Sequence, residues 1–153
     1  MEEQVQQQNS TTTLEDYVAD HQEKWNKIIA ELNQRMKTIP DMVDLVNVVY
    51  AKRQDAVEYY YSLLNKIAPL TKRYNQRYAA EYNNLKVNAQ IRYTTEAAIN
   101  AQIMSNLADL IYTKDILDAH VRFMADTIKS IDNLIFGINH RIRLEEFIEG
   151  VKK

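Results

Sequence analysis

The fold of this chain is decided between Ile103 and Ile142, where the sequence reads IMSNLADLIYTKDILDAHVRFMADTIKSIDNLIFGINHRI. Apolar residues return at spacings of four and three along this stretch, and Lys114 is the single interruption. The series consists of Ile103, Leu107, Leu110, Leu117, Val121, Met124, Ile128, Ile131, Ile135, Ile138 and Ile142. An apolar residue every 3.5 positions is typical of a coiled-coil seam, because it keeps one narrow stripe turned toward a partner helix.

Such a seam needs a cover, which comes either from this chain or from further copies of it. Many stripes of this kind are ordinary core, but about five heptads exceed the usual globular helix of about 11–12 residues. We therefore expect residues 96–150 to form a heptad helix that joins several copies. The residues expected at that contact are Leu117, Val121, Met124, Ile128, Ile131, Ile135, Ile138 and Ile142. Lys114, inside the stripe, is a candidate for fixing register or copy number.

Composition favours an all-α fold with a few long helices, a coiled-coil-like C-terminal helix and assembly into a helical oligomer. The 153 residues include two glycines and two prolines, the residues that end helices and shape tight turns. Cysteine is absent, which excludes disulfides, thiol catalysis and thiolate metal sites. The polar N-terminus does not resemble a signal peptide and no apolar run is long enough for a membrane span, so we expect a cytoplasmic protein.

The chain is expected to form a disordered N-terminal arm over residues 1–12 and one all-helical domain over 13–153. Thr13 offers an N-cap to a first helix. That helix carries a second seam, made of Leu14, Val18, His21, Trp25, Ile28 and Leu32. Pro40 marks the start of the next helix, Pro69 is expected to end or kink it, and Thr94 or Thr95 is the candidate cap of the C-terminal helix.

Charge is distributed unevenly, although the formal net charge is only -2. Residues 50–93 carry 8 Lys or Arg against 3 Asp or Glu, whereas both flanking segments are acidic, and this basic segment also holds most of the 10 tyrosines. Cations that follow phosphates and rings that stack on unpaired bases are what binding of single-stranded nucleic acid requires. The candidate contacts are Lys52, Arg53, Lys66, Lys72, Arg73, Arg77, Tyr59, Tyr60, Tyr74 and Tyr78.

A second interpretation of the basic segment stays open. Tyr74, Tyr78 and Tyr82 return at every fourth position, so they also fit the apolar stripe of their own helix. Arg73 and Arg77 flank that stripe, where they would be either solvated or paired with nearby acids.

Residues for catalysis are not recognisable. The three histidines, His21, His120 and His140, are scattered, and no nucleophile with a base, metal-ligand spacing or phosphate-binding loop is present. We therefore expect no enzyme activity, no cofactor and no bound metal.

Several short segments resemble the UvsY recombination mediator proteins of T-even-type phages. Val57-Glu58-Tyr59-Tyr60 is similar to that family's Leu-Asp-Tyr-Tyr element, and the likeness runs from Leu14 to Gly150. Its other segments are Arg92-Tyr93 ahead of Glu96, Ile128-Lys129-Ser130, Phe136-x-Ile138-x-His140 and Phe147-x-x-Gly150. The family's Lys-x-Arg falls on Gln54 and Ala56 here, so Lys72, Arg73 and Arg77 are expected to carry more of the DNA contact than Lys52 and Arg53.

The resemblance implies a recombination mediator that acts inside an infected host cell. Members of the family are helical, bind single-stranded DNA and assemble into ring-like homo-oligomers, for which a heptamer is one candidate. They promote loading of a RecA-like recombinase onto DNA covered by single-strand-binding protein. Two other interpretations remain: a coiled-coil scaffold or assembly chaperone that does not bind nucleic acid, and an accessory subunit of an enzyme.

Overall fold

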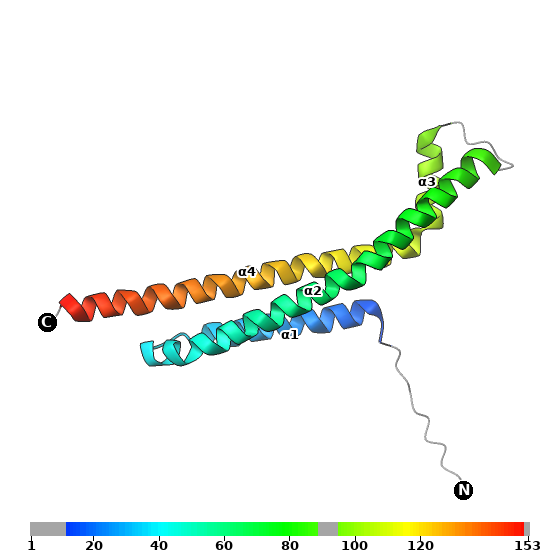
Figure 1. Cartoon of the computed structure of the whole chain (residues 1–153). Coiled ribbons are helices and arrows are strands. Elements are labelled where there is room, and N and C mark those ends of the chain that lie inside the picture. Colours follow the sequence, from blue (N-terminus) through cyan, green and yellow to red (C-terminus); the bar gives the residue numbers. More distant parts are fainter. Residues whose placement is uncertain (1–11, 89–94, 152–153) are drawn as a thin grey trace, which may run out of the picture.

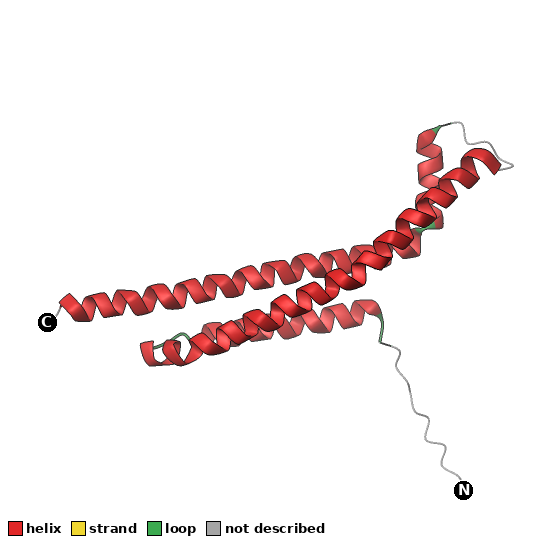
Figure 2. Ribbon diagram, in the orientation of Figure 1, coloured by secondary structure: helices red, strands yellow, loops and turns green. Residues whose placement is uncertain are grey.

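The computed structural model describes residues 12–88 and 95–151, which are almost wholly helical (Figure 1). The elements are α1 (Leu14–Gln34), α2 (Ile39–Asn83), the short π-helix η1 (Asn84–Asn88), α3 (Glu96–Asn106) and α4 (Ala108–Val151). Figure 2 shows helices joined by short loops, and no strand lies within these ranges. The all-α prediction is therefore confirmed. Of the arm predicted over residues 1–12, only Thr12 is described, and Arg92 and Tyr93 lie outside the described residues.

Three of the helices, α1, α2 and α3, begin at a threonine cap. The Thr13 hydroxyl accepts a hydrogen bond from the backbone N–H of Asp16 at 3.1 Å, and the Asp16 carboxylate accepts one from the backbone N–H of Thr13 at 3.2 Å. This reciprocal pair satisfies two N–H groups that the first helical turn leaves without partners. Thr38 and Thr95 cap α2 and α3 through their hydroxyls. The caps predicted at Thr13 and Thr95 are therefore confirmed.

Helix α2 continues through Pro69 as one helix of 45 residues, so the helix end considered at this position does not occur. Proline removes the hydrogen bond to the carbonyl of Asn65, four residues earlier. Both Pro69 and Asn65 are exposed, and water can satisfy that carbonyl. The loss is therefore small enough for packing on both sides of Pro69 to keep the helix intact.

Two separate apolar cores hold the helices together. The larger, here called the bundle core, lies where α1 and α2 pack along α4 (Figure 1). Its buried members are Trp25, Leu32, Met42, Leu45, Val49, Ala56, Leu63, Met124, Ile131, Leu134 and Ile138. The smaller, the tip core, has three buried residues, Ile99, Ile103 and Leu107, packed against the end of α2. The chain is thus a three-helix bundle that ends in an α2–α3 hairpin.

The predicted seam of α4 lies inside a single chain. Leu117, Met124, Ile131 and Ile138 are buried, and Val121, Ile128, Ile135 and Ile142 are half-buried along one edge. The second buried line consists of His120, Thr127 and Leu134, which the apolar spacing did not select. Contact between copies through this seam stays a prediction, and the residues named for it already serve the fold of one chain.

The seam also changes direction at Leu107, where α3 ends and α4 begins. Leu107 has φ -106° and ψ 11°, outside the helical range. Residues 96–150 therefore form two helices, where the heptad pattern predicted one. Lys114, the break in the stripe, is half-buried and forms an ion pair with Asp118 one turn later.

No helix in the described ranges has the length and apolar character needed to cross a lipid bilayer.

Candidate nucleic-acid interface

Two cations in the first half of α2, Lys52 and Arg53, are held by carboxylates. Lys52 Nζ lies 2.9 Å from Asp55 Oδ2, one turn along the same helix. Arg53 Nε donates to Asp132 Oδ1 of α4 at 2.5 Å, and this hydrogen bond raises the pKa of the guanidinium. Lys52 and Arg53 point about 100° apart around the helix axis. They therefore do not form one basic surface.

The cations beyond Pro69 are arranged differently. Lys72, Arg73 and Arg77 are exposed, and none of them makes an ion pair with another described residue. The acid closest in sequence, Glu81, accepts a hydrogen bond from Asn106 Nδ2 at 3.1 Å. These three side chains are therefore free to neutralise phosphates of a bound strand.

Lys66 extends this basic group toward the bundle. It is exposed, and its Nζ lies 5.9 Å from the centre of the Tyr17 ring of α1. Lys66 and Arg73 are seven residues apart and Arg77 follows four residues later, so all three lie on one face of α2. We call Lys66, Lys72, Arg73 and Arg77 the distal basic group.

Tyr59 and Tyr60, two of the predicted stacking residues, are packed within the bundle. The Tyr59 ring stacks on His21 with centres 4.7 Å apart, and its hydroxyl lies 3.0 Å from His120 Nε2. Burial raises the pKa of Tyr59 well above its ordinary value. Tyr60 packs against the bundle core. The inner faces of both rings are therefore occupied by the protein itself.

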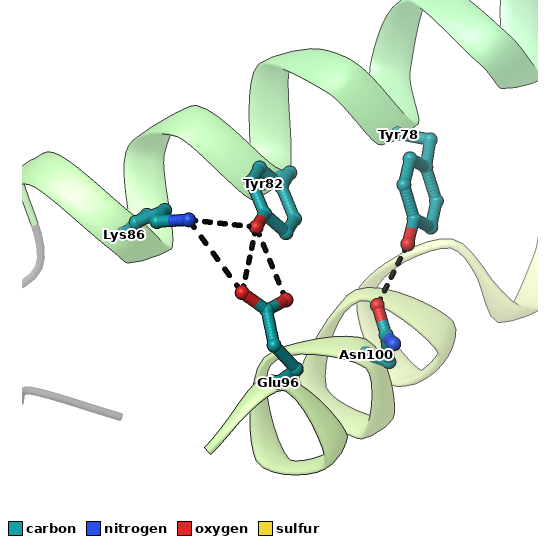
Figure 3. Close-up of polar contacts among 5 residues, drawn as sticks. All are labelled: Tyr78, Tyr82, Lys86, Glu96 and Asn100. Atoms are coloured by element: carbon teal, nitrogen blue, oxygen red, sulfur yellow. Dashed lines mark hydrogen bonds and ion pairs between the residues drawn. The ribbon is translucent and has the colours of Figure 1, made fainter. Parts of the chain in front are cut away.

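Tyr74 and Tyr78 pack against the tip core together with Tyr82, which confirms their place in the apolar stripe of α2. Figure 3 shows how the hydroxyls of Tyr78 and Tyr82 reach α3. Tyr78 donates to Asn100 Oδ1 at 2.7 Å, and Tyr82 donates to Glu96 Oε1 at 2.9 Å. These hydrogen bonds, together with packing against the tip core, hold α3 against the end of α2.

The most exposed tyrosines of α2 are Tyr50 and Tyr61, which the sequence prediction did not select. Their exposed fractions are 49% and 60%. The spacing from Tyr50 to Tyr61, and from Tyr61 to Lys72, is eleven residues, close to three helical turns. The three side chains therefore share the outward face of α2. This spacing is visible in the sequence alone, although the predicted stacking residues were Tyr59 and Tyr60 and not Tyr50 and Tyr61.

A hollow of about 250 Å³ lies between α1 and α2 beside Tyr59. Lys24 and Lys52 lie at this hollow together with Asp55, and Trp25 and Ile28 form apolar parts of its wall. Across the described ranges, no three His, Asp or Glu side chains are grouped closely enough to hold a metal ion. The arrangement offers charge and aromatic surface to a ligand.

Comparisons with protein-family models, curated proteins and solved structures found no match to this chain.

Proposed function

We propose that this protein is a non-enzymatic mediator that binds single-stranded DNA and promotes loading of a RecA-like recombinase onto DNA covered by single-strand-binding protein. The observation that carries the binding step is the distal basic group, whose four cations are exposed and without carboxylate partners among the described residues. The resemblance to the UvsY family supplies the biological role.

The position of each residue on α2 determines its proposed role in binding. Lys66, Arg73 and Arg77 follow the phosphates along one face of α2, and Lys72 adds charge on the outward face. Tyr61, exposed beside them, stacks on a base, a contact worth about 1–3 kcal/mol. The shape imposed on the strand then favours the recombinase over the resident binding protein.

Self-assembly strengthens such binding, since one copy with four cations binds weakly and linked copies bind with avidity. The support for assembly is the end of α4, where residues 143–151 are all exposed. Leu144, Ile148 and Val151 form a short apolar series of their own at spacings of four and three, about 100° around the helix from the buried stripe, whose next positions are Glu145 and Glu149. This apolar end, together with the half-buried edge of the seam, is the proposed contact between copies in a ring-like homo-oligomer.

Titration of fluorescein-labelled poly-dT at 50 and 200 mM salt tests the binding step. Affinity should fall steeply with salt, because a contact between one cation and a single strand contributes about 0.7 to the slope of log K against log salt. Arg73→Glu with Arg77→Glu removes two contacts, so the slope should decrease by about 1.4 and the affinity by about tenfold or more.

The matched control is Arg35→Glu with Lys37→Glu, which makes the same change in net charge in the connection between α1 and α2. Because this connection lies at the opposite end of the bundle from the distal basic group, its reversal should leave the affinity almost unchanged (Figure 1). Equal losses in both variants would mean that overall charge, and not the distal group, governs binding. Absence of binding by the wild-type protein at 50 mM salt would refute the proposed function.

The apolar end of α4 also favours a second candidate, a scaffold or assembly chaperone that only self-assembles. Leu144→Asp with Ile148→Asp separates the two candidates when native mass and poly-dT affinity are measured together. A mediator should lose mass and most of its avidity, whereas a scaffold should lose mass and show no DNA binding before or after the change.

A further inference from the structure

The outward face of α4 carries a line of side chains that the proposed function does not use. Arg122, Lys129, Phe136 and Arg143 follow one another at intervals of seven residues. They stand opposite the buried line of Leu117, Met124, Ile131 and Ile138, because half a helical turn separates the two series. All four members of this outward line are exposed.

Phe136 is the unusual member of the line. Its exposed fraction is 73%, the second highest among the large apolar residues of the described ranges. The ring lies parallel to that of His140, with ring centres 6.1 Å apart and an angle of 4° between the planes. Both residues are exposed, so the two parallel rings face water in a single copy.

The charge around this aromatic pair is positive. The acids of α4 are concentrated near its two ends, and residues 119–144 contain four cations against two acids. One of these acids, Asp132, is already bonded to Arg53 of α2. Arg122, Lys129 and Arg143 make no ion pair with other residues in the described part of the chain.

This charge argues against a second copy of the chain as the occupant of the face. A symmetric contact between two copies would place the same surface against itself. Cations that alternate with one aromatic ring would then meet cations, and like charges brought together at an interface are unfavourable. The occupant that matches the face is anionic and carries flat rings of its own.

We propose that the outward line of α4, centred on Phe136 and His140, is a second binding track for single-stranded nucleic acid. Lys129 and Arg143 lie fourteen residues apart, about 21 Å along the helix, which is long enough for several nucleotides. The two cations hold phosphates while a base stacks on Phe136. This inference rests on the proposed function, because it adds a second contact for the same ligand.

The track has a consequence for how one copy handles DNA. The distal basic group lies on α2 on both sides of Pro69, whereas the outward line lies on the exposed side of α4, opposite its buried line. A strand that occupies both must bend around the bundle, or else two strands are held by one copy. The first arrangement exposes a segment of DNA between the tracks, where a recombinase can begin to assemble.

Photo-crosslinking with an oligonucleotide that contains 5-iodouracil locates the two tracks directly. Wild-type protein should give crosslinked peptides from the α2 segment around Tyr61 and from the α4 segment around Phe136. Phe136→Leu keeps an apolar side chain but removes the ring, so the α4 crosslink should disappear and the affinity for long oligonucleotides should fall about tenfold. Phe136→Trp should restore both.

The double variant Lys129→Gln/Arg143→Gln measures what the two cations contribute to binding. Its control, Arg35→Gln/Lys37→Gln, loses the same amount of charge. The α4 pair should shorten the length of DNA that one copy covers, whereas the control pair should not. Arg73→Glu with Arg77→Glu should remove the α2 crosslink and leave the α4 crosslink in place.

Several outcomes would overturn the second track while leaving the proposed function standing. Wild-type binding that is unaffected by every α4 variant is one, and loss of the α4 crosslink together with the α2 crosslink in Arg73→Glu/Arg77→Glu is another. A drop in native mass for Phe136→Leu would assign the face to contact between copies. Stronger competition by polyglutamate than by oligonucleotide would assign it to an acidic protein. Wild-type protein that binds no DNA at all would remove both proposals.

Discussion

The bundle and the tip use the same residue types for opposite purposes. In the bundle, Lys52 and Arg53 are bonded to carboxylates and Tyr59 is enclosed by histidines. Beyond Pro69, α2 loses its neighbour α1, and Arg73 and Arg77 are left free. Where three helices meet, charged and aromatic side chains stabilise the fold. Where only two helices meet, Tyr78, Tyr82 and Lys86 are bonded to α3, but Arg73 and Arg77 stay available for a ligand.

The largest expected effect comes from replacing one buried isoleucine by alanine in each core. Ile131→Ala in the bundle core should lower the free energy of unfolding by about 2–5 kcal/mol, because Ile131 is fully buried. Ile103 is equally buried, but only two other buried residues share the tip core. Ile103→Ala should therefore loosen the hairpin and leave global unfolding in urea less affected.

Hydrogen exchange followed by mass spectrometry separates these two responses. Ile131→Ala should raise exchange throughout α1, α2 and α4, whereas Ile103→Ala should raise it in α3 and the end of α2 alone. An equal drop in urea midpoint for both variants, with exchange raised everywhere, would show that bundle and tip unfold as one unit.

The next largest expected effect is a loss of stability at acidic pH. It arises from two histidines in the bundle, His21 and His120. His120 is fully buried and His21 is half-buried, and Nδ1 of each has no hydrogen-bond partner. Burial lowers the pKa of both histidines, and each also has positive charge nearby: Lys24 and Lys66 beside His21, and His21 beside His120. The groups packed around them include Tyr17 and Tyr59.

A lowered pKa in the folded state means that the unfolded chain binds more protons, so stability rises with pH across this range. The contribution should be complete above the unfolded value near 6.5 and decline as the pH falls toward the folded pKa values. Urea unfolding at pH 7.5 and 5.5 measures the decline. His120→Leu should reduce it, and the exposed His140→Gln should leave it unchanged; an identical decline in His120→Leu would exclude His120 as a cause.

The helices were predictable because their signals are local. Threonine caps, Pro40 and heptad spacing depend on neighbouring residues, and they correctly indicated long helices with caps at Thr13 and at Thr95, one of the two candidates. The helix end considered at Pro69 does not occur. The break at Leu107 had no such signal, since no glycine or proline stands there. Packing of α3 against the end of α2 sets that change of direction.

The candidate site was less predictable than the fold, because ion pairs between helices depend on tertiary structure. Arg53 and Asp132 are 79 positions apart, and no local pattern links them. His120 and Thr127 belong to the buried stripe of α4 although both are polar, since His120 meets Tyr59 and the Thr127 hydroxyl donates to the carbonyl of Phe123. The free cations beyond Pro69 could be named from sequence, but not distinguished from the bonded ones.

A smaller effect, opposite in sign, is expected in the middle of α4. A Cβ added at Gly137 would meet no other atom within 4 Å, and Gly137 does not have a positive φ. Gly137→Ala should therefore raise the free energy of unfolding by about 0.5–1 kcal/mol, since alanine is the better helix former. Gly150→Ala is the control, because it lies near the end of α4 and should gain less. Destabilisation by Gly137→Ala would indicate that another copy approaches the helix at this position.

The smallest effect is expected when Arg53, a bundle cation, loses its carboxylate partner and so becomes free, as Arg73 and Arg77 are. Asp132→Asn removes the carboxylate that holds Arg53, an exposed pair across two helices that should contribute about 0.2–1 kcal/mol. A double-mutant cycle with Arg53→Gln isolates that coupling. The released Arg53 should also bind phosphate, so affinity for poly-dT should rise by about twofold and its salt dependence should steepen by about 0.7. If the coupling is measurable but the salt dependence is unchanged, the part of α2 around Arg53 lies outside the path of the strand, which then contacts α2 only from Tyr61 onward.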